Sequence, residues 1–406
     1  MRSIARFYSW FWVLYFPLCI AFYDLVNDYV DEFMTLILIL FTLMKLKSHY
    51  VNKRPIKEAW QCIMIFLFYL VYSLILKVNV PMAAIIDFQQ QIRPYTVFYC
   101  TLILMPQFSK RQKKWMLFSI LASLVGYLFW KWSTILELEN VIFGSLSIGA
   151  GMTYYLFTKE TGFNRYVSTA IVLFGLLCGK FKYIGECVAF VGVVFLLKKK
   201  IKIGSQKSIA FALVLICAVI FFAWSRFDSY FIAGMSNDQL ARPMMYKTAP
   251  KIFMDYFPFG SGLGTFGTSA SAKTYYSPLY YKYGLAEIWG LSPSDHGAFN
   301  ADSFYPGLAQ FGFVGLFFFI VFWKRRLSAI NNIPDLRYYK IAIMAFLCLA
   351  IENTGDTSYL SGRGMVYFML IALCLSQKEP QRRFFRSPNT QQNQSLEITR
   401  ISVAER

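Results

Sequence analysis

Charged residues are scarce in this chain: they account for 16% of its 406 residues, whereas hydrophobic residues account for 57%. Histidine occurs only twice, and the eight cysteines all fall within or at the edges of apolar runs. This distribution excludes a disulfide framework and a zinc site built on regular Cys/His spacing. The mean hydropathy of +0.44 indicates that most of the chain is suited to a lipid bilayer rather than to water.

Apolar runs of bilayer length recur along the whole sequence. They predict an all-α, polytopic integral membrane protein with about twelve transmembrane helices. The first run is not followed by a small-residue cleavage site, so we expect it to be retained as a helix. The expected spans are residues 7–26, 31–46, 58–77, 92–107, 114–131, 141–158, 166–179, 182–198, 207–224, 305–324, 339–353 and 363–377.

The basic residues orient these spans. With the N-terminus in the cytoplasm, 29 of the 41 lysines and arginines fall in segments on the cytoplasmic side. The positive-inside rule therefore predicts that both termini are cytoplasmic. The net charge of +19 is distributed in small groups between apolar runs, which argues against nucleic acid as a partner.

These features divide the chain into four parts. Residues 1–224 are expected to hold nine helices and residues 305–377 the last three. Between them, residues 225–304 form one large outer loop with short amphipathic helices, and residues 378–406 form a polar, disordered cytoplasmic tail. Because this is the one sizeable loop outside the bilayer, we expect it to carry the chemistry. The charged groups that this topology brings to the outer side are Arg93, Lys180, Lys182, Arg226, Arg242, Lys247, Lys251, Glu287, Asp295, His296, Asp302, Glu352, Asp356 and Arg363.

Three basic candidates lie at the outer ends of predicted helices. Lys180 and Lys182 stand in the short connector GKFKY, where two cations repel each other unless an anion lies near them. Glu186, one helical turn below Lys182, is the alternative partner. Arg93, in QQQIRPYTVFYC, is a further candidate for anion binding, with snorkelling at the membrane interface as the alternative.

The loop contributes a basic helix and a glycine-rich turn. The segment ARPMMYKTAPKIFMDYF predicts an amphipathic helix that carries Arg242 and Lys247. An arginine at such a place suits bidentate recognition of a phosphate. FPFGSGLGTFG, with Gly260, Gly262 and Gly264, lacks the Lys-Ser/Thr ending of a nucleotide-binding loop. We therefore expect these glycines to let the backbone turn tightly beneath a lipid or a sugar.

The end of the loop offers an acid and a histidine. Asp302 precedes the tenth span in NADSFYPGLAQFGFVGL, where it either caps the helix or acts as a base at the outer mouth of the bundle. His296 is the one histidine of the loop and the second candidate for a base. The aromatic stretch YYSPLYYKYGLAEIWG suits either the membrane interface or stacking on sugars.

From Arg242 to Leu316 these motifs follow the order of a known family. The chain resembles the O-antigen ligase/polymerase superfamily of bacterial envelope proteins and, more narrowly, the Wzy-type polymerases of capsule and exopolysaccharide systems. In that family the large loop begins with an arginine and an amphipathic stretch, passes through a glycine-rich turn and leads into a Gly-x-x-Gly helix. Arg242, FPFGSGLGTFG and DSFYPGLAQFGFVGL match these elements in turn.

The resemblance implies an inverting glycosyltransferase in the bacterial inner membrane that acts on its periplasmic face. The donor would be a glycan on undecaprenyl pyrophosphate, and the acceptor a sugar hydroxyl of another lipid-linked repeat unit. Asp302 or His296 would take the acceptor proton, and cationic side chains would stabilise the leaving group without a metal or other cofactor. Flippase and chain-length regulator proteins are the implied protein partners. The residues assigned to the pyrophosphate are Arg242, Lys182, Lys180, Lys247 and Arg93.

The sequence departs from the family at two places. A lysine, Lys180 or Lys182, stands where the family has an arginine, and the histidine–asparagine pair of the ligases falls at Ala301 and Asp302. The second departure favours a polymerase over an O-antigen ligase. A transporter or flippase of lipid-linked sugars is the alternative from another class, and it would be expected to carry ionisable groups deep in the membrane.

Overall fold

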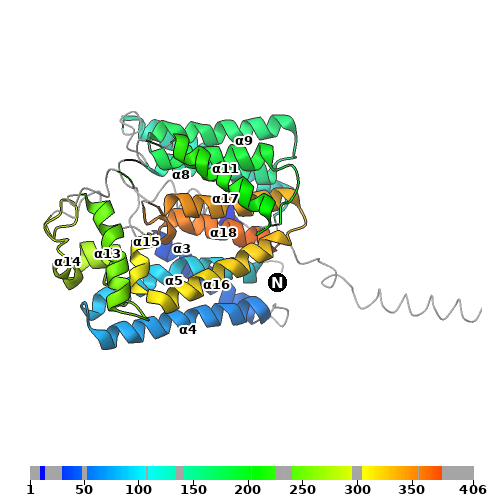
Figure 1. The fold of residues 1–406 in the computed structure, drawn as a ribbon. Coiled ribbons are helices and arrows are strands. Elements are labelled where there is room, and N and C mark those ends of the chain that lie inside the picture. Colours follow the sequence, from blue (N-terminus) through cyan, green and yellow to red (C-terminus); the bar gives the residue numbers. More distant parts are fainter. Residues whose placement is uncertain are drawn as a thin grey trace, which may run out of the picture.

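A computed structural model describes residues 10–13, 30–133, 141–222, 240–294 and 304–376, apart from gaps at 48–52, 107, 203 and 355, and a few isolated residues between 224 and 232. Every regular element in these ranges is helical and none is a strand, which confirms the all-α prediction. Long helices run side by side in a bundle, with the 240–294 segment at one end of it (Figure 1). The predicted tail, residues 378–406, and most of the first predicted span lie outside the described residues.

The elements follow one another as long helices, a loop with short helices, and long helices again. Before the loop they are α3 (Val30–Leu46), α4 (Lys53–Leu76), α5 (Pro81–Leu104), α6 (Lys110–Trp130), α8 (Val141–Phe157), α9 (Gly162–Phe174), η2 (Gly175–Cys178), α10 (Phe181–Val191), η3 (Gly192–Leu196) and α11 (Gln206–Phe222). In the loop they are α13 (Ala241–Asp255), η6 (Ala270–Thr274) and α14 (Pro278–Lys282). After it they are α15 (Phe304–Gly307), η7 (Leu308–Gln310), α16 (Gly312–Asn331), α17 (Leu336–Glu352), η8 (Ser358–Leu360) and α18 (Gly362–Ser376).

Helix starts follow local capping chemistry. Ser109 and Gln112 form a capping box that opens α6, with the Gln112 amide donating to Ser109 Oγ at 3.2 Å. Asp335 accepts the Arg337 amide at 2.7 Å at the start of α17. Pro81 occupies the first turn of α5, where its missing N–H is not needed.

The predicted spans from 31–46 onward each overlap with one or more helical elements, but their crossing of a membrane remains a prediction. By length and composition one described helix, α4, is sufficient to cross a bilayer, and only 17% of its apolar window is buried. Four shorter apolar helices are Ile142–Phe157, Gly162–Cys178, Gln206–Ala218 and Gly362–Ser376.

The boundaries predicted for the tenth span were wrong. The expected helix over 305–324 is broken into α15 and η7, and the long helix α16 starts only at Gly312 and continues to Asn331. Gly312 has φ +55°, and the carbonyls of Ala309 and Gln310 accept the amides of Ser261 and Gly262. The chain bends here because these carbonyls bond the glycine-rich turn instead of continuing a helix.

Contacts between connectors define one end of the bundle, which we call the loop end: residues 77–80, 179–180, 240–294, 353–354 and 356–361. The Asn79 side chain donates to the carbonyls of Gly264 at 2.6 Å and Tyr275 at 3.0 Å. Tyr72, near the end of α4, donates to the Gly260 carbonyl at 2.9 Å. Segments predicted to lie on the outer side of the membrane therefore meet at one end.

At the opposite, basic end, lysines and arginines from the predicted cytoplasmic segments hold neighbouring helices together. Arg326 pairs with Glu58 at 2.5 Å, which joins α16 to α4. Lys340 donates to the Val194 carbonyl at 2.9 Å, and Lys45 to the Ile103 carbonyl at 2.7 Å. The contacts at the two ends agree with the predicted alternation of helix direction along the chain.

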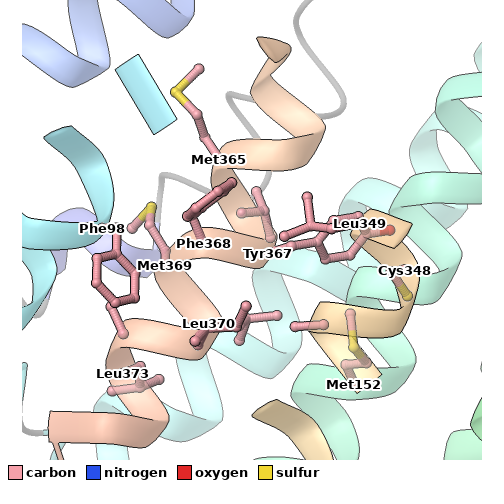
Figure 2. Close-up of a cluster of buried hydrophobic side chains, with 14 of the residues drawn as sticks. Phe98, Met152, Cys348, Leu349, Met365, Tyr367, Phe368, Met369, Leu370 and Leu373 are labelled. Carbon is pink, nitrogen blue, oxygen red and sulfur yellow. The ribbon is translucent and has the colours of Figure 1, made fainter. Parts of the chain in front are cut away.

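Helix α18 occupies the centre of the bundle. Apart from Arg363 at its start, its side chains are buried from Gly362 to Ser376, and it packs against α5 and α17. Figure 2 draws part of this core, where Phe368 and Met369 lie near Phe98 of α5. A helix that is apolar all round has to be shielded from water, and in α18 the neighbouring helices provide that shielding.

The 240–294 segment has a small core of its own that reaches the bundle. Helix α13 contributes its inner face, as the amphipathic pattern predicted, and Val78 of the α4–α5 connector packs against the cluster. The buried members of the cluster are Ala241, Met245, Ile252, Phe266, Ala272, Leu279, Tyr280, Leu285, Ile288, Leu291 and Ala309. Because Ala309 belongs to the segment after the loop, the loop is packed against the helices rather than extended away from them.

The glycine-rich turn needs glycine for two reasons. Gly260, Gly262 and Gly264 have φ of +82°, +90° and +69°, in the left-handed region that side chains rarely adopt. A Cβ on Gly264 would lie 2.5 Å from the backbone of Ala83, and one on Gly260 would lie 2.4 Å from the Gly312 amide. The turn is therefore pressed against both the start of α5 and the start of α16.

We expect Gly264→Ala to destabilise the protein much more than Gly284→Ala. Both glycines have φ of +69°, so both variants incur the left-handed backbone penalty of about 1–2 kcal/mol. No atom lies within 4 Å of a Cβ at Gly284, whereas Gly264 meets the Ala83 backbone, which adds a further cost of about 1–3 kcal/mol. Thermal unfolding of the two purified variants measures the difference, and equal losses would show that the turn is not closely packed.

Candidate functional site

Four charged side chains meet at the loop end. Lys182 Nζ lies 2.7 Å from Asp356 Oδ2 and 3.4 Å from Glu352 Oε2. Arg363 bridges the same two acids, with Nη2 at 2.9 Å from Asp356 Oδ2 and Nη1 at 3.2 Å from Glu352 Oε2. We call these four residues the loop-end cluster. It joins the start of α10, the end of α17 and the start of α18.

The cluster is strongly desolvated. Glu352 is fully buried, and the side chains of Lys182 and Arg363 are 17% and 16% exposed. Tyr367 donates to Glu352 Oε1 at 3.0 Å, so both carboxylate oxygens of this residue are bonded. Two cations face two carboxylates, which makes the cluster neutral and allows it to remain ionised away from water.

Asp356 differs from Glu352 because it is accessible. Its side chain is 29% exposed and lies on the short connector between α17 and α18. Burial alone would raise the pKa of the Asp356 carboxyl, but the charges of Arg363 and Lys182 outweigh this effect and hold the pKa below its ordinary value. The Asp356 carboxylate thus occupies a position between two cations where an anion is favoured.

Glu186 lies in the same region but does not pair with the lysine. It is fully buried, and neither of its carboxyl oxygens has a hydrogen-bond partner among the described residues. The sequence had offered Glu186 as the partner of Lys182, and this expectation was wrong because the folded chain brings Glu352 and Asp356 to that lysine instead. A buried carboxyl without a partner is costly to ionise.

Helix α13 docks beside the loop-end cluster. The Tyr246 hydroxyl donates to the carbonyl of Thr354, two residues before Asp356. Arg242 is one helical turn before Tyr246, and both it and Lys247 are partly buried on the same helix. The basic helix predicted from the sequence therefore lies against the connector that carries Asp356.

The segment that closes the loop reaches the same connector. The Phe304 ring stacks on Tyr359 with centroids 4.2 Å apart, and the Tyr305 hydroxyl donates to the Ala350 carbonyl at 3.0 Å. Asp302 and His296, the two candidate bases, lie in residues 295–303, outside the part of the chain that the structure describes.

The glycine-rich turn does not present a cradle of backbone amides to a phosphate. Its nine consecutive amides, residues 260–268, all donate to other groups of the protein. Gly264 donates to Asp87 Oδ2 at 2.8 Å, and Thr265 and Phe266 share Gln310 Oε1 at 2.7 and 3.2 Å. The other acceptors are the carbonyls of Tyr256, Ala309 and Gln310 and the hydroxyl oxygens of Ser73, Tyr280 and Ser271. The backbone turns tightly here and packs against the helices, whereas the predicted place of this turn beneath a lipid or a sugar stays a prediction.

The aromatic stretch divides into structural and exposed rings. Tyr280 is fully buried and its hydroxyl accepts the Gly267 amide at 3.1 Å, while Tyr276 donates to the Leu291 carbonyl at 2.6 Å. Tyr281 and Trp289 are 61% and 62% exposed. These are the two most exposed rings of the stretch, and both alternatives, a membrane interface or stacking on a sugar, stay open for them.

Two further basic candidates are not part of the cluster. Arg93 is 6% exposed and ion-pairs with Asp31 and with Glu32, the latter at 2.5 Å, at the start of α3. Lys180 is the N-cap residue of α10, two positions before Lys182, and is partly exposed. Of the residues predicted to hold a pyrophosphate, Lys182 therefore belongs to the cluster. Arg242 and Lys247 lie on α13, which packs beside the cluster.

Sequence reasoning had marked Glu352, Asp356 and Arg363 as outer charges but had given them no role. The available signal was their position, because each stands at the end of an apolar run, where an ionisable group has to be paired or solvated. Which cation pairs with which acid depends on how the helices are arranged in space, and the spacing of residues along the chain does not reveal that arrangement.

Compared with protein-family models the chain matches none, and no curated protein gives a significant match. Within the described ranges, no three His, Cys, Asp or Glu side chains are grouped so that they could hold a metal ion.

We expect Glu352→Gln to be more destabilising than Glu186→Gln. Both glutamates are fully buried on neighbouring helices, but Glu352 neutralises two cations, and breaking such a pair costs about 3 kcal/mol. Glu186 takes part in no described ion pair, so its variant should stay within about 1 kcal/mol of the parent. Unfolding temperatures of the two purified variants test this, and similar losses would contradict the assignment of charges.

The pKa of Asp356 predicts acid sensitivity. Since its folded pKa is depressed, the stability it contributes is complete above its unfolded pKa of about 4 and is lost as pH falls through lower values. Asp356→Asn should therefore be less stable than the parent at pH 7, with a difference that shrinks as pH falls from about 5 to about 3. Asp255→Asn, which changes a half-exposed carboxylate on α13, is the control and should show a smaller pH-dependent difference.

Proposed function

We propose that this chain is a polytopic membrane glycosyltransferase that polymerises lipid-linked glycan repeat units at the loop end. The transferred glycan would come from undecaprenyl pyrophosphate, and the acceptor would be a sugar hydroxyl of a second lipid-linked unit. The observation that carries the proposal is the meeting of Lys182 and Arg363 around an accessible anion position, with the basic helix α13 docked beside it.

The exposed surface of the helices supports a membrane location. Helix α4 is 24 residues long and mostly exposed, although a core helix of that composition would be covered by protein. Phe129, Phe221 and Ile75 are each more than 70% exposed on α6, α11 and α4. Large apolar side chains exposed on several long helices are typical of a protein whose solvent is lipid.

The loop-end cluster supports binding of a pyrophosphate. An anion that displaced the Asp356 carboxylate would take over its charge-assisted bonds to Lys182 and Arg363 without leaving either cation unpaired. Arg242 on α13 would add a further cation at the side nearest the loop. A pyrophosphate group held in this way is a better leaving group because the cations stabilise the charge that develops on it.

The proposed reaction is a single displacement. The acceptor hydroxyl oxygen forms a bond to the anomeric carbon while the bond from that carbon to the pyrophosphate oxygen breaks, which inverts the configuration. The acceptor proton passes to Asp302 or His296, the two bases that the sequence predicts, and undecaprenyl pyrophosphate leaves with the electron pair. Tyr281 and Trp289 are exposed rings that could stack on the glycan.

A transporter of lipid-linked sugars is the second candidate, and Glu186 is the observation that favours it. A fully buried carboxyl without a described partner, inside a predicted span, is the kind of group that binds and releases a proton during transport. An O-antigen ligase differs from a polymerase only in its acceptor. The glycan profile distinguishes the three.

The test is the lipid-linked glycan profile of a host from which the gene has been deleted, complemented with parent or variant protein at equal levels. We expect the deletion to accumulate a single lipid-linked repeat unit and the parent protein to restore polymer. Arg242→Ala should reduce polymer at least about 100-fold. Lys251→Ala, which removes an exposed lysine from the same helix, should leave it near normal.

Other outcomes would identify the alternatives. Long polymer that stays on the lipid carrier in the deletion host would indicate a ligase, and repeat units retained on the cytoplasmic face would indicate a transporter. Near-normal polymer from both Arg242→Ala and Asp302→Ala would rule out the proposed mechanism.

A further inference from the structure

A groove of about 740 Å³ lies between α4 and α16, and none of the four residues of the loop-end cluster lines it. Its walls are mainly apolar, and the side chains at its lips include Trp60, Met64 and Phe317, which are 59%, 59% and 54% exposed. A cavity of this size is large enough for a ligand of drug size or for part of a hydrocarbon chain. Because its lips are exposed, the groove opens to the side of the bundle.

The groove has one charged mouth, at the basic end. Three cations and one acid line it there: Lys57, Arg325, Arg326 and Glu58. Glu58 is committed to Arg326 at 2.5 Å, whereas Lys57 and Arg325 are exposed and have no ion-pair partner among the described residues. At this mouth, two positive charges therefore have no described ion-pair partner, and the rest of the groove is mainly apolar.

The groove is about as long as one leaflet of a bilayer. Along α4 it runs from Lys57 to Tyr69, which at about 1.5 Å per residue is about 18 Å. The hydrocarbon of one leaflet is about 15 Å thick, half of the bilayer core of about 30 Å. A ligand with a negative head at the mouth would therefore have its hydrocarbon chain alongside Met64 and Phe317.

We propose that this groove binds one anionic phospholipid of the cytoplasmic leaflet, with its phosphate between Lys57 and Arg325 and an acyl chain along α4 and α16. The charge of the mouth selects an anionic head, and the apolar wall of leaflet length selects a diacyl lipid over a soluble phosphate. The inference rests on the membrane location proposed above and not on the glycosyl transfer, so it holds or fails separately from that activity.

The experiment is native mass spectrometry of the purified full-length protein in detergent, with phosphatidylglycerol or phosphatidylcholine of the same acyl chains. We expect one phosphatidylglycerol to be retained in preference to phosphatidylcholine. The double variant Lys57→Gln/Arg325→Gln should weaken phosphatidylglycerol binding by roughly 30-fold, as expected for two surface cations. Lys53→Gln/Lys324→Gln removes the same charge from exposed positions of the same two helices outside the groove, and it should bind like the parent.

A second measurement locates the acyl chain. Phosphatidylglycerol with brominated chains should quench the fluorescence of Trp60, measured as the difference between the parent and Trp60→Phe. In the Lys57→Gln/Arg325→Gln background, the same lipid should quench the fluorescence equally with and without the Trp60→Phe substitution.

Three results would overturn the proposal. Equal retention of both lipids by the parent would mean that the groove does not distinguish an anionic headgroup from a zwitterionic one. An equal loss in the two double variants would mean that charge acts without regard to the groove. Preferential retention of undecaprenyl phosphate over phosphatidylglycerol would assign the groove to a polyprenyl chain instead.

Discussion

The arrangement of this molecule depends on the cost of placing a charge inside an apolar bundle. Arg363 stands at the first turn of the most buried helix, and Lys182 at the first turn of α10. Neither cation can remain ionised there without an anion, so α17 must end with Glu352 facing both of them. This pairing aligns three helices at one end and positions the connector that carries Asp356.

The same constraint gives the two acids of the cluster different environments. A pair of buried cations without counterions would be unstable in the absence of ligand, whereas a pair that is fully neutralised by buried acids would have no affinity for one. Here one acid is buried and bonded on both oxygens, and the other is partly exposed on a short connector. The two cations are therefore neutralised by one buried acid and by one acid that solvent can reach.

Much of the helical framework could be predicted from the sequence, because apolar runs and capping residues are local signals. The glycine-rich turn was also predictable, since positive φ values favour glycine. The ion-pair partners that lie far apart in the sequence were not predictable. Local spacing pointed from Lys182 to Glu186, four residues away, while the acids that bind it lie about 170 residues further on. Spacing along the chain likewise does not show that α3 supplies the acids that pair with Arg93, a candidate for anion binding.

The late position of α18 in the chain has a consequence for biogenesis. This helix fills the centre of the bundle, but the ribosome completes it after all the other described helices have been made. Its contacts with α5 join segments more than 250 residues apart, so the earlier helices lack their central packing partner until α18 has been made. Packing of the bundle centre is then a late event, and a chain that stops before α18 would lack the helix around which the others pack.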